Sequence, residues 1–435
     1  MKRVTRNIAG GLALSLTAHL GLTTNGHAAK EFAEIRTASN RSPAAVSDSP
    51  SFTSRLRSLS ELQQRVVEGD KSALTEQLTL ARAIAKDLER NPADQWRNLR
   101  DLRALTKYVL SGGDPTILSR LLNSPTFPEQ ELSLARGVVA YSHGDRGQAA
   151  KWLGQVEHRH LGPSLGGHVA LVKAVITVHS SPADALKLCQ EAILHSPGTH
   201  IEEAALRLSI SIGISSGDMA SVTRSHTRHL LRFPNSLYAS DIDTQVARAV
   251  AANPGISAAQ FDMADRLAVL IPPSRRRAFF AQLAEASLRA GQFTAAIQAA
   301  RLALLPPTSP PASDAESTAA LLAIQGAALI LTADRKEGLS RLIEARGAEP
   351  SAATADLIAT AESLMAMIKA PPVQSAATPD ATITPSNEQV PPPPSIGTAK
   401  HTETSTRGQT QFEAVRTRAM EALASADQLI EQSKK

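Results

Sequence analysis

The sequence predicts an all-α fold, a tetratricopeptide-like helical-repeat solenoid, on three observations. Small residues recur along the middle of the chain at a nearly constant step, at Ala149, Ala185, Val222, Ala259, Ala296 and Gly338. The steps are 36, 37, 37, 37 and 42 residues, slightly longer than the period of about 34 in tetratricopeptide repeats. Apolar residues follow the helical period of 3.6, while alternating β-type runs are almost absent. The Ala- and Leu-rich composition also favours helices.

The residues after these anchors have the spacing of the second helix of a repeat. A bulkier residue follows four positions on, another residue three later and Pro five after that, as in Ala185, Cys189, Ala192 and Pro197; Val222, His226, His229 and Pro234; and Gly338, Leu342, Ala345 and Pro350. Gly144, Gly217 and Gly291 each precede an anchor by five positions, where a turn between helices needs positive φ. An irregular all-helical domain with similar turns is the alternative.

Residues 1–28 are expected to form a secretory signal peptide. They combine a positive start, an apolar core and a cleavage motif, at Lys2, Arg3 and Arg6, at residues 8–22 and at residues 26–28. The core is shorter than the ~20 residues of a membrane-spanning helix, so we expect cleavage, with a retained signal anchor as the alternative. The mature chain is then expected in the periplasm, without stable membrane insertion, and its residues 29–53 are expected to be a disordered leader.

Helical patterning covers residues 54–370 and begins with an amphipathic stripe at Leu56, Leu59, Leu62 and Val66. Residues 371–410 are rich in Pro, Ser, Thr and Ala, a composition typical of an extended, disordered linker. Residues 411–435 keep one apolar stripe, as in an amphipathic helix. We expect this terminal helix either to cap the solenoid or to dock on a partner helix.

Charge and cysteine content limit the chemistry that the chain can be expected to have. The formal net charge is +5, but basic and acidic residues are interspersed, so nucleic-acid binding is not indicated. Cys189 is the single cysteine, which rules out an intramolecular disulfide. A buried, inert thiol is expected at this repeat position, and a mixed disulfide with a partner is the alternative.

No motif in the chain predicts a metal, a cofactor or a catalytic group. His158 and His160, and His226 and His229, form close pairs, but the chain has neither HExxH nor the further ligands that a zinc site needs. These histidines are expected at helix surfaces and interfaces. The glycine-rich residues 162–167 lack the GK[ST] of a phosphate loop and are expected to form a turn that enters a helix over residues 169–179.

Neighbouring carboxylates and clustered arginines also have structural interpretations. Glu202 and Glu203 lie in a first helical turn, and Thr199 with Glu202 has capping-box spacing. Adjacent helix residues point in different directions, which favours capping over a catalytic pair. The basic clusters at residues 224–232 and 275–277 are expected to be solvated faces. Binding of acidic partner segments or of the charged cell wall is the alternative.

Four strings of the sequence together resemble one known family. They are LSGG at residues 110–113, GPSLGGH at 162–168, PGTHIEEAALR at 197–207 and RFPNSLYA at 232–239. In this order and spacing they resemble the MotC family, periplasmic chemotaxis and motility proteins of rhizobia and related alphaproteobacteria. The resemblance covers residues 54–260 well and weakens afterwards. His200 stands where an apolar residue is expected.

The resemblance implies a role in flagellar rotation through binding of the periplasmic part of the stator protein MotB, and it brings no catalytic residues. The candidate partner-binding residues are Glu202, Glu203, Arg207, Arg232 and Tyr238, which have capping and packing as their other interpretation. A periplasmic adapter for cell-envelope assembly is a second hypothesis. An enzyme acting on envelope polymers is the rival class, but it needs a convergent acid and base or a nucleophile, which the sequence does not offer.

Overall fold

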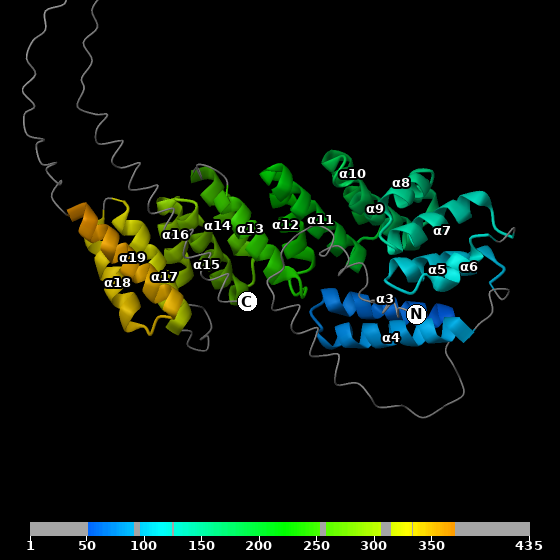
Figure 1. Ribbon diagram of the computed structural model, residues 1–435, viewed down its shortest axis with the longest axis horizontal. Helices are drawn as coiled ribbons and strands as arrows, with labels where there is room; N and C mark the ends of the chain where they lie inside the picture. The colour runs from blue at the N-terminus through cyan, green and yellow to red at the C-terminus, as the bar shows by residue number, and fades with distance from the viewer. Residues whose placement is uncertain are drawn as a thin grey trace, which may run out of the picture. The chain divides into compact units, whose positions relative to one another are not determined.

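The computed structural model describes residues 51–90, 96–123, 126–252, 258–305, 315–332 and 334–369. The predicted signal peptide, the linker over 371–410 and the terminal helix over 411–435 lie outside these residues, as does nearly all of the leader. Every described secondary-structure element is helical, which confirms the predicted fold class (Figure 1). The elements are α3 (Phe52–Val67), α4 (Ser72–Arg90), α5 (Leu99–Leu110), α6 (Thr116–Leu121), α7 (Glu129–Ser142), α8 (Arg146–Gly154), η3 (His158–Leu161), α9 (Pro163–Thr177), α10 (Pro182–His195), α11 (His200–Ser216), α12 (Met219–Arg232), α13 (Ala239–Ala252), α14 (Ala258–Leu270), α15 (Pro273–Arg289), α16 (Phe293–Leu304), α17 (Ala315–Ile330), α18 (Arg335–Gly347) and α19 (Ala352–Lys369).

The chain divides into two compact units, with the boundary near Arg276 in α15. In the first unit, α7 packs on α8, α9 on α10 and α11 on α12, and each pair contacts the next. In the second unit, α17 packs on α16, α18 and α19. This pairing of consecutive helices is the arrangement of a helical-repeat solenoid.

The predicted anchors occupy alternate helices, as the second helix of each repeat requires. Ala149, Ala185, Val222, Ala296 and Gly338 lie in α8, α10, α12, α16 and α18, and all five are buried. Ala259 lies in α14. Gly144, Gly217 and Gly291 have φ values of 81°, 72° and 72°. The predicted repeat spacing and its turns are therefore confirmed.

Glycines on the facing helices explain why the anchors must be small. A Cβ atom added to Gly213 in α11 would lie 2.8 Å from Val222 Cγ2. One added to Gly326 in α17 would lie 2.9 Å from the carbonyl oxygen of Gly338. The paired helices thus approach more closely than larger side chains permit.

The helix expected over residues 169–179 begins six residues earlier, at Pro163. Gly162 has a φ of 74° and precedes the helix, whereas Gly166 and Gly167 belong to it. A Cβ on Gly166 would lie 2.7 Å from the carbonyl oxygen of His158, and one on Gly167 would overlap the Ser196 hydroxyl. These two glycines permit close packing and do not form the predicted turn.

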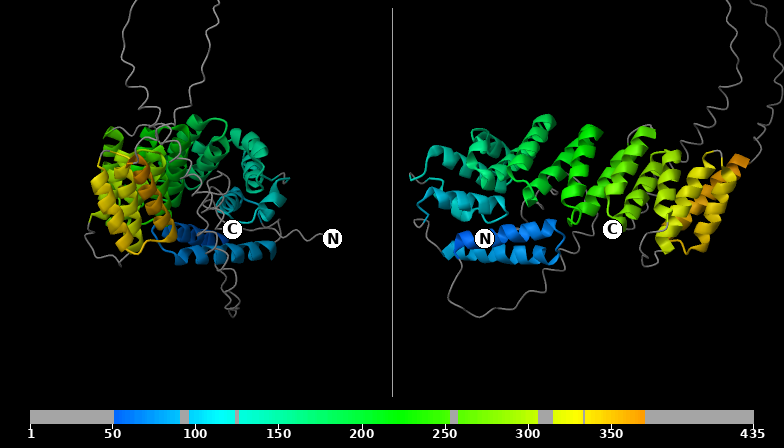
Figure 2. Two further views of the ribbon diagram at one scale, coloured as in Figure 1. Left: turned by 60° about the vertical axis from the view of Figure 1, so that its left-hand side comes forward. Right: turned by 180° about the vertical axis from the view of Figure 1, so that it is seen from behind.

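The first helix pair departs from simple stacking of neighbours. The predicted stripe of α3 is buried at Leu56, Leu59, Leu62 and Val66, and α3 packs on α4, α5 and α11 (Figures 1 and 2). The Gln64 amide donates to the carbonyl oxygen of Gly198 at 3.1 Å, and its oxygen accepts from the N–H of His200 at 3.1 Å. Repeats of a regular solenoid contact only their neighbours, so α3 adds a tie over more than 130 residues.

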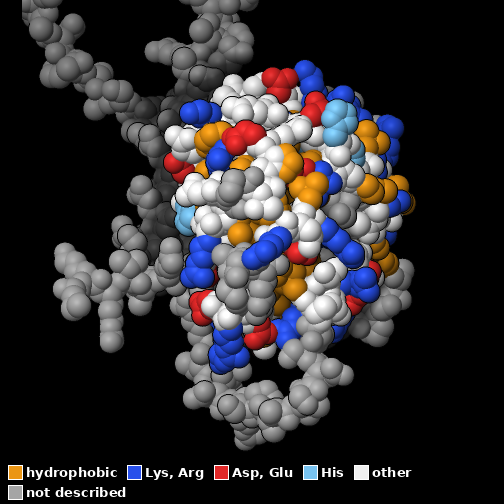
Figure 3. Space-filling model, turned by 90° about the vertical axis from the view of Figure 1, so that its right-hand side faces the viewer, with side chains coloured by type: hydrophobic (Ala, Val, Ile, Leu, Met, Phe, Trp, Pro, Cys, Tyr) orange, Lys and Arg blue, Asp and Glu red, His pale blue; other side chains and the backbone are white. Residues whose placement is uncertain are grey.

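The state of the cysteine and the mixture of charges on the surface agree with the sequence analysis. Cys189 is a free, fully buried thiol, and burial raises its pKa to about 12, so it is inert at neutral pH. The face in Figure 3 shows basic, acidic and apolar side chains interspersed. Over the described ranges, no helix combines the length and apolar character needed to cross a bilayer.

Candidate partner-binding site

The five candidate residues lie together in the first unit. Glu202, Glu203 and Arg207 lie on α11, Arg232 is the last residue of α12, and Tyr238 precedes α13. Both glutamates are completely buried, whereas the Arg232 side chain is 45% exposed. Most of this set therefore faces the protein and not the solvent.

Glu202 joins the start of α11 to α12. Thr199 is the N-cap, and its hydroxyl accepts from the N–H of Ile201 at 3.3 Å. The Glu202 carboxylate accepts from the N–H of Gly198 at 2.5 Å, one residue before the position of an ideal capping box. It also accepts from Arg228 at 2.7 Å and from Arg232 at 3.2 Å. Capping and ion pairing thus use both of its oxygens.

Glu203 is the centre of a second group of contacts. Its carboxylate accepts from Arg207 Nε at 2.9 Å and from the Ser236 hydroxyl at 3.0 Å, and it lies 3.2 Å from His229 Nε2. Burial raises the pKa of Glu203, but Arg207 and His229 outweigh that effect and hold it below its usual value. The Arg207 guanidinium lies 4.0 Å above the Tyr238 ring, a cation–π arrangement.

A third carboxylate pairs with the next helices. Asp243 on α13 lies 2.9 Å from His226 Nε2 and 3.2 Å from Arg275 Nε. Burial lowers the pKa of His226. Arg275 is only 16% exposed at its side chain, so the expectation of a solvated face over residues 275–277 is wrong for this residue. Its charge is used for an internal ion pair.

His200, the departure from the family pattern, takes the place of an apolar side chain. Its ring packs edge-to-face on His168, with ring centroids 5.7 Å apart. Burial lowers its pKa to about 4, and the nearby Lys107 charge acts in the same direction. At neutral pH the ring is therefore uncharged and compatible with its partly buried position.

These contacts define what the polar cluster can do. We use the name polar cluster for Glu202, Glu203 and Asp243 with the basic partners given above. Each carboxylate already has a cationic partner, and within the described residues no group of three potential ligands can hold a metal ion. The cluster can fix α11, α12 and α13 relative to one another.

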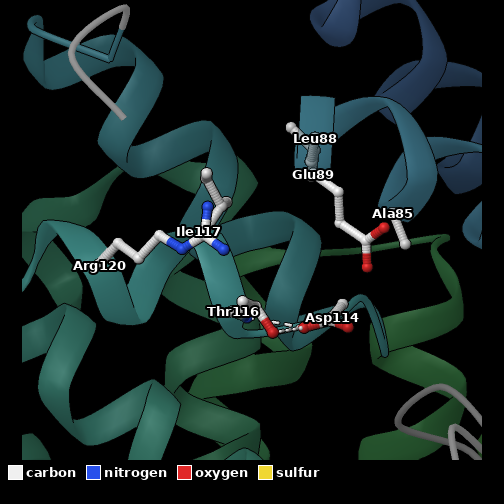
Figure 4. Close-up of a pocket in the computed structure, with 7 residues that line it drawn as sticks. All are labelled: Ala85, Leu88, Glu89, Asp114, Thr116, Ile117 and Arg120. Atoms are coloured by element: carbon white, nitrogen blue, oxygen red, sulfur yellow. Dashed lines mark hydrogen bonds between the residues drawn. The ribbon is translucent and has the colours of Figure 1, made fainter. Parts of the chain in front are cut away.

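A small cavity lies between α4 and the start of α6 (Figure 4). Glu89 and Arg120 contribute to its walls, and the Asp114 carboxylate accepts from the Thr116 N–H at 2.7 Å and from its hydroxyl at 2.5 Å. Its volume is about 10 Å³, which is at the lower limit for one water molecule. It is too small for an organic substrate.

A larger depression, which we call the basic groove, has a volume of about 600 Å³. It is bordered by α3, α5, the end of η3 and the start of α9. Its basic residues are Arg57, Arg100, Arg103 and Lys107, and its apolar ones are Leu56, Leu99, Ala104, Leu161 and Leu165. Among the described residues, none of those that line it is Asp or Glu.

One cation of the basic groove is neutralised internally. Arg103 binds Glu131 at 2.5 Å, whereas Arg57, Arg100 and Lys107 have no carboxylate partner among the described residues. Burial lowers the pKa of Lys107, and no carboxylate opposes that effect. Sequence analysis missed this groove, although the spacing of residues 100, 103 and 107 places three cations on one helix face.

The family model described as "Chemotaxis protein MotC" matches residues 2–435. Chemotaxis protein MotC of Rhizobium meliloti (strain 1021) is 29% identical over 197 residues, 45% of either chain, so the matched part spans about half of that relative. No solved structure matches the chain. Because the family model covers nearly the whole sequence, the chain belongs to the MotC family of chemotaxis proteins.

Proposed function

We propose that this protein works in the periplasm, where it supports flagellar rotation by binding the periplasmic part of the stator protein MotB. The observation that carries the proposal is the family match over residues 2–435, which makes this a motility-related protein. Residues 1–28 support export through their positive start and apolar core. Stacked helix pairs support a binding role, because they present extended surfaces to a partner.

The mode of action is recognition without catalysis. The carboxylates of the polar cluster are held by Arg and His side chains, so none is free to act as a general base toward a substrate. Among the candidate residues, Arg232 is the exposed one, whereas the others are buried or partly buried. We propose a partner contact for Arg232, and a positioning role for Glu202, Glu203, Arg207 and Tyr238.

Calorimetry of residues 29–435 with the periplasmic region of MotB from the same cell tests this function. We expect a Kd of about 1 µM or tighter. The same titration without residues 371–435 tells whether the linker and terminal segment take part. A strain lacking the protein should lose swimming and keep its cell shape. Absent binding together with altered cell shape would contradict the proposal and favour the adapter for envelope assembly.

A further inference from the structure

We infer that the basic groove is a docking site for a short acidic segment of a partner protein, in which apolar side chains stand between carboxylates. The inference names the site and the partner chemistry, and in this way it deepens the proposed function on which it rests. Arg57 on α3 and Arg100 and Lys107 on α5 supply the cations. Leu56, Leu161 and Leu165 supply the apolar surface.

Charge complementarity identifies the occupant. Three cations share one depression, and no carboxylate of the described residues neutralises them. Lys107 is half-buried, so its ammonium group has lost part of its hydration without gaining a counter-ion. A carboxylate that enters the groove supplies the missing counter-ion, and partial enclosure makes that interaction stronger than at an open surface.

The apolar lining makes a protein segment the best match. Leu99 is 37% exposed at the groove, although it is a large hydrophobic residue. A volume of about 600 Å³ accommodates several side chains. An occupant must therefore offer apolar groups and carboxylates within a few ångströms of each other, as Leu and Glu on one helix face do. A flat layer of anionic headgroups or a carbohydrate strand lacks that combination.

A neighbouring hollow shows the contrast within the same unit. It lies between α3 and α4 and is of similar size, with a volume of about 560 Å³. It also contains cations, but it includes Asp87, which pairs with Arg55 and lies 3.8 Å from Arg90. The fold supplies a counter-ion in that hollow, whereas the residues that the structure describes supply none for three cations of the basic groove.

The test uses the mature chain, residues 29–435, and a fluorescein-labelled helical peptide. The peptide is about 14 residues long, with Leu and Glu on one face, and a second peptide carries Gln for each Glu. The groove variant is R100E/K107E, accompanied by the milder R100Q/K107Q. The matched control is R335E/K336E, which reverses two exposed charges at the start of α18 in the second unit.

We expect the unaltered chain to bind the Glu peptide better than the Gln peptide. R100E/K107E should weaken that binding about tenfold or more, R100Q/K107Q should weaken it less, and R335E/K336E should not change it. Thermal melts should show the same folded state for all variants. Equal affinity of R100E/K107E and the unaltered chain for the Glu peptide overturns the inference. Groove-dependent binding of anionic vesicles, together with no groove-dependent binding of the peptide, also overturns it.

The same variants separate this inference from the proposed function. If MotB binds the unaltered chain and R100E/K107E equally well, the groove assignment is wrong and the function stands. If the unaltered chain does not bind MotB but binds the Glu peptide through the groove, the site assignment stands and the assigned partner is wrong.

Discussion

The polar cluster around α11 and the basic groove beside α5 both contain cationic side chains, but they differ in whether those cations are paired. In the polar cluster, Glu203 has Arg207, His229 and Ser236 around it, and the Glu202 carboxylate is fully enclosed. In the basic groove, Lys107 and Arg100 face a depression to which the described part of the chain contributes no carboxylate. The first region uses its charges to hold helices together, and the second leaves them available.

This difference teaches that charge counts do not locate a binding surface. The family string at residues 197–207 contains the conspicuous glutamates, yet their partners are internal. Buried ion pairs gain little net free energy, but breaking one leaves a costly unpaired charge. Cations without partners lower stability slightly and are retained where a ligand supplies the counter-charge.

Of the substitutions that test this comparison, removal of the Glu203 carboxylate should change the stability of the protein most. In Glu203→Ala, Arg207 and His229 lose their buried partner, so the free energy of unfolding should fall by about 3 kcal/mol or more. Urea denaturation followed by circular dichroism measures this. Glu61→Ala is the matched control, because Glu61 is exposed on α3, and it should change stability by less than about 0.5 kcal/mol. Similar losses in both variants would show that the buried pairing of Glu203 contributes no more to stability than an exposed carboxylate does.

The pH dependence of stability tests the comparison further, because the pKa of His200 depends on charges in both regions, Lys107 and Glu203. Its pKa is about 4 in the folded protein against an ordinary 6.5, so the unfolded chain binds the proton more readily. Its contribution to stability is present above the ordinary pKa and is lost as the pH falls toward the folded pKa. Between about pH 7 and about pH 5, we expect a loss of about 1–2 kcal/mol from this group.

His200→Leu supplies the control for that titration. The variant should lose this part of the pH dependence, while the contributions of His226 and Glu203, whose pKa values are also lowered, persist. Lys107 lowers the pKa of His200, and Glu203 raises it. Ring-proton NMR should therefore show a higher His200 pKa in Lys107→Met. An unchanged pKa there would contradict the electrostatic link between the two regions.

The smallest expected effect has the opposite sign. Lys107→Met removes a half-buried charge that has no counter-ion among the described residues, so stability at neutral pH should rise by up to about 0.5 kcal/mol. Binding of the acidic peptide should weaken in the same variant. The rise should shrink as the pH approaches the lowered pKa of Lys107, because the unaltered chain then loses its proton as well. A loss of stability would show that Lys107 has a structural role.

The repeat architecture was predictable because close helix packing requires small residues, which recur in the sequence at a nearly constant step. Ala149, Ala185 and Val222 had to be small for local geometric reasons, and their spacing is readable along the chain. The start of α9 was not, because Gly166 and Gly167 look like a turn. These two positions must be glycine because the His158 backbone and the Ser196 side chain approach them closely. Such tertiary contacts cannot be read from a local sequence pattern.

The candidate site was predictable only in part. The pairing of Glu203 with Arg207 follows from their spacing of four on one helix. The approach of His229 and Ser236 depends on how α12 returns toward α11, which is a tertiary property. The three cations of α5 are visible in the sequence as a helical face. Whether they form a binding site depends on tertiary contacts, because Arg57 comes from α3 and the described groove lining contains no carboxylate.

The hydrogen bonds of Gln64 have a consequence for the order in which the first unit assembles. Its partners, Gly198 and His200, are synthesised more than 130 residues later, and Gly69 fits against Asn235, later still. The first helix pair therefore cannot complete its contacts until α11 and the turn after α12 exist. Closing so long a loop costs entropy before any contact forms. The first unit should fold in one cooperative step, and not by adding repeats one at a time from its beginning.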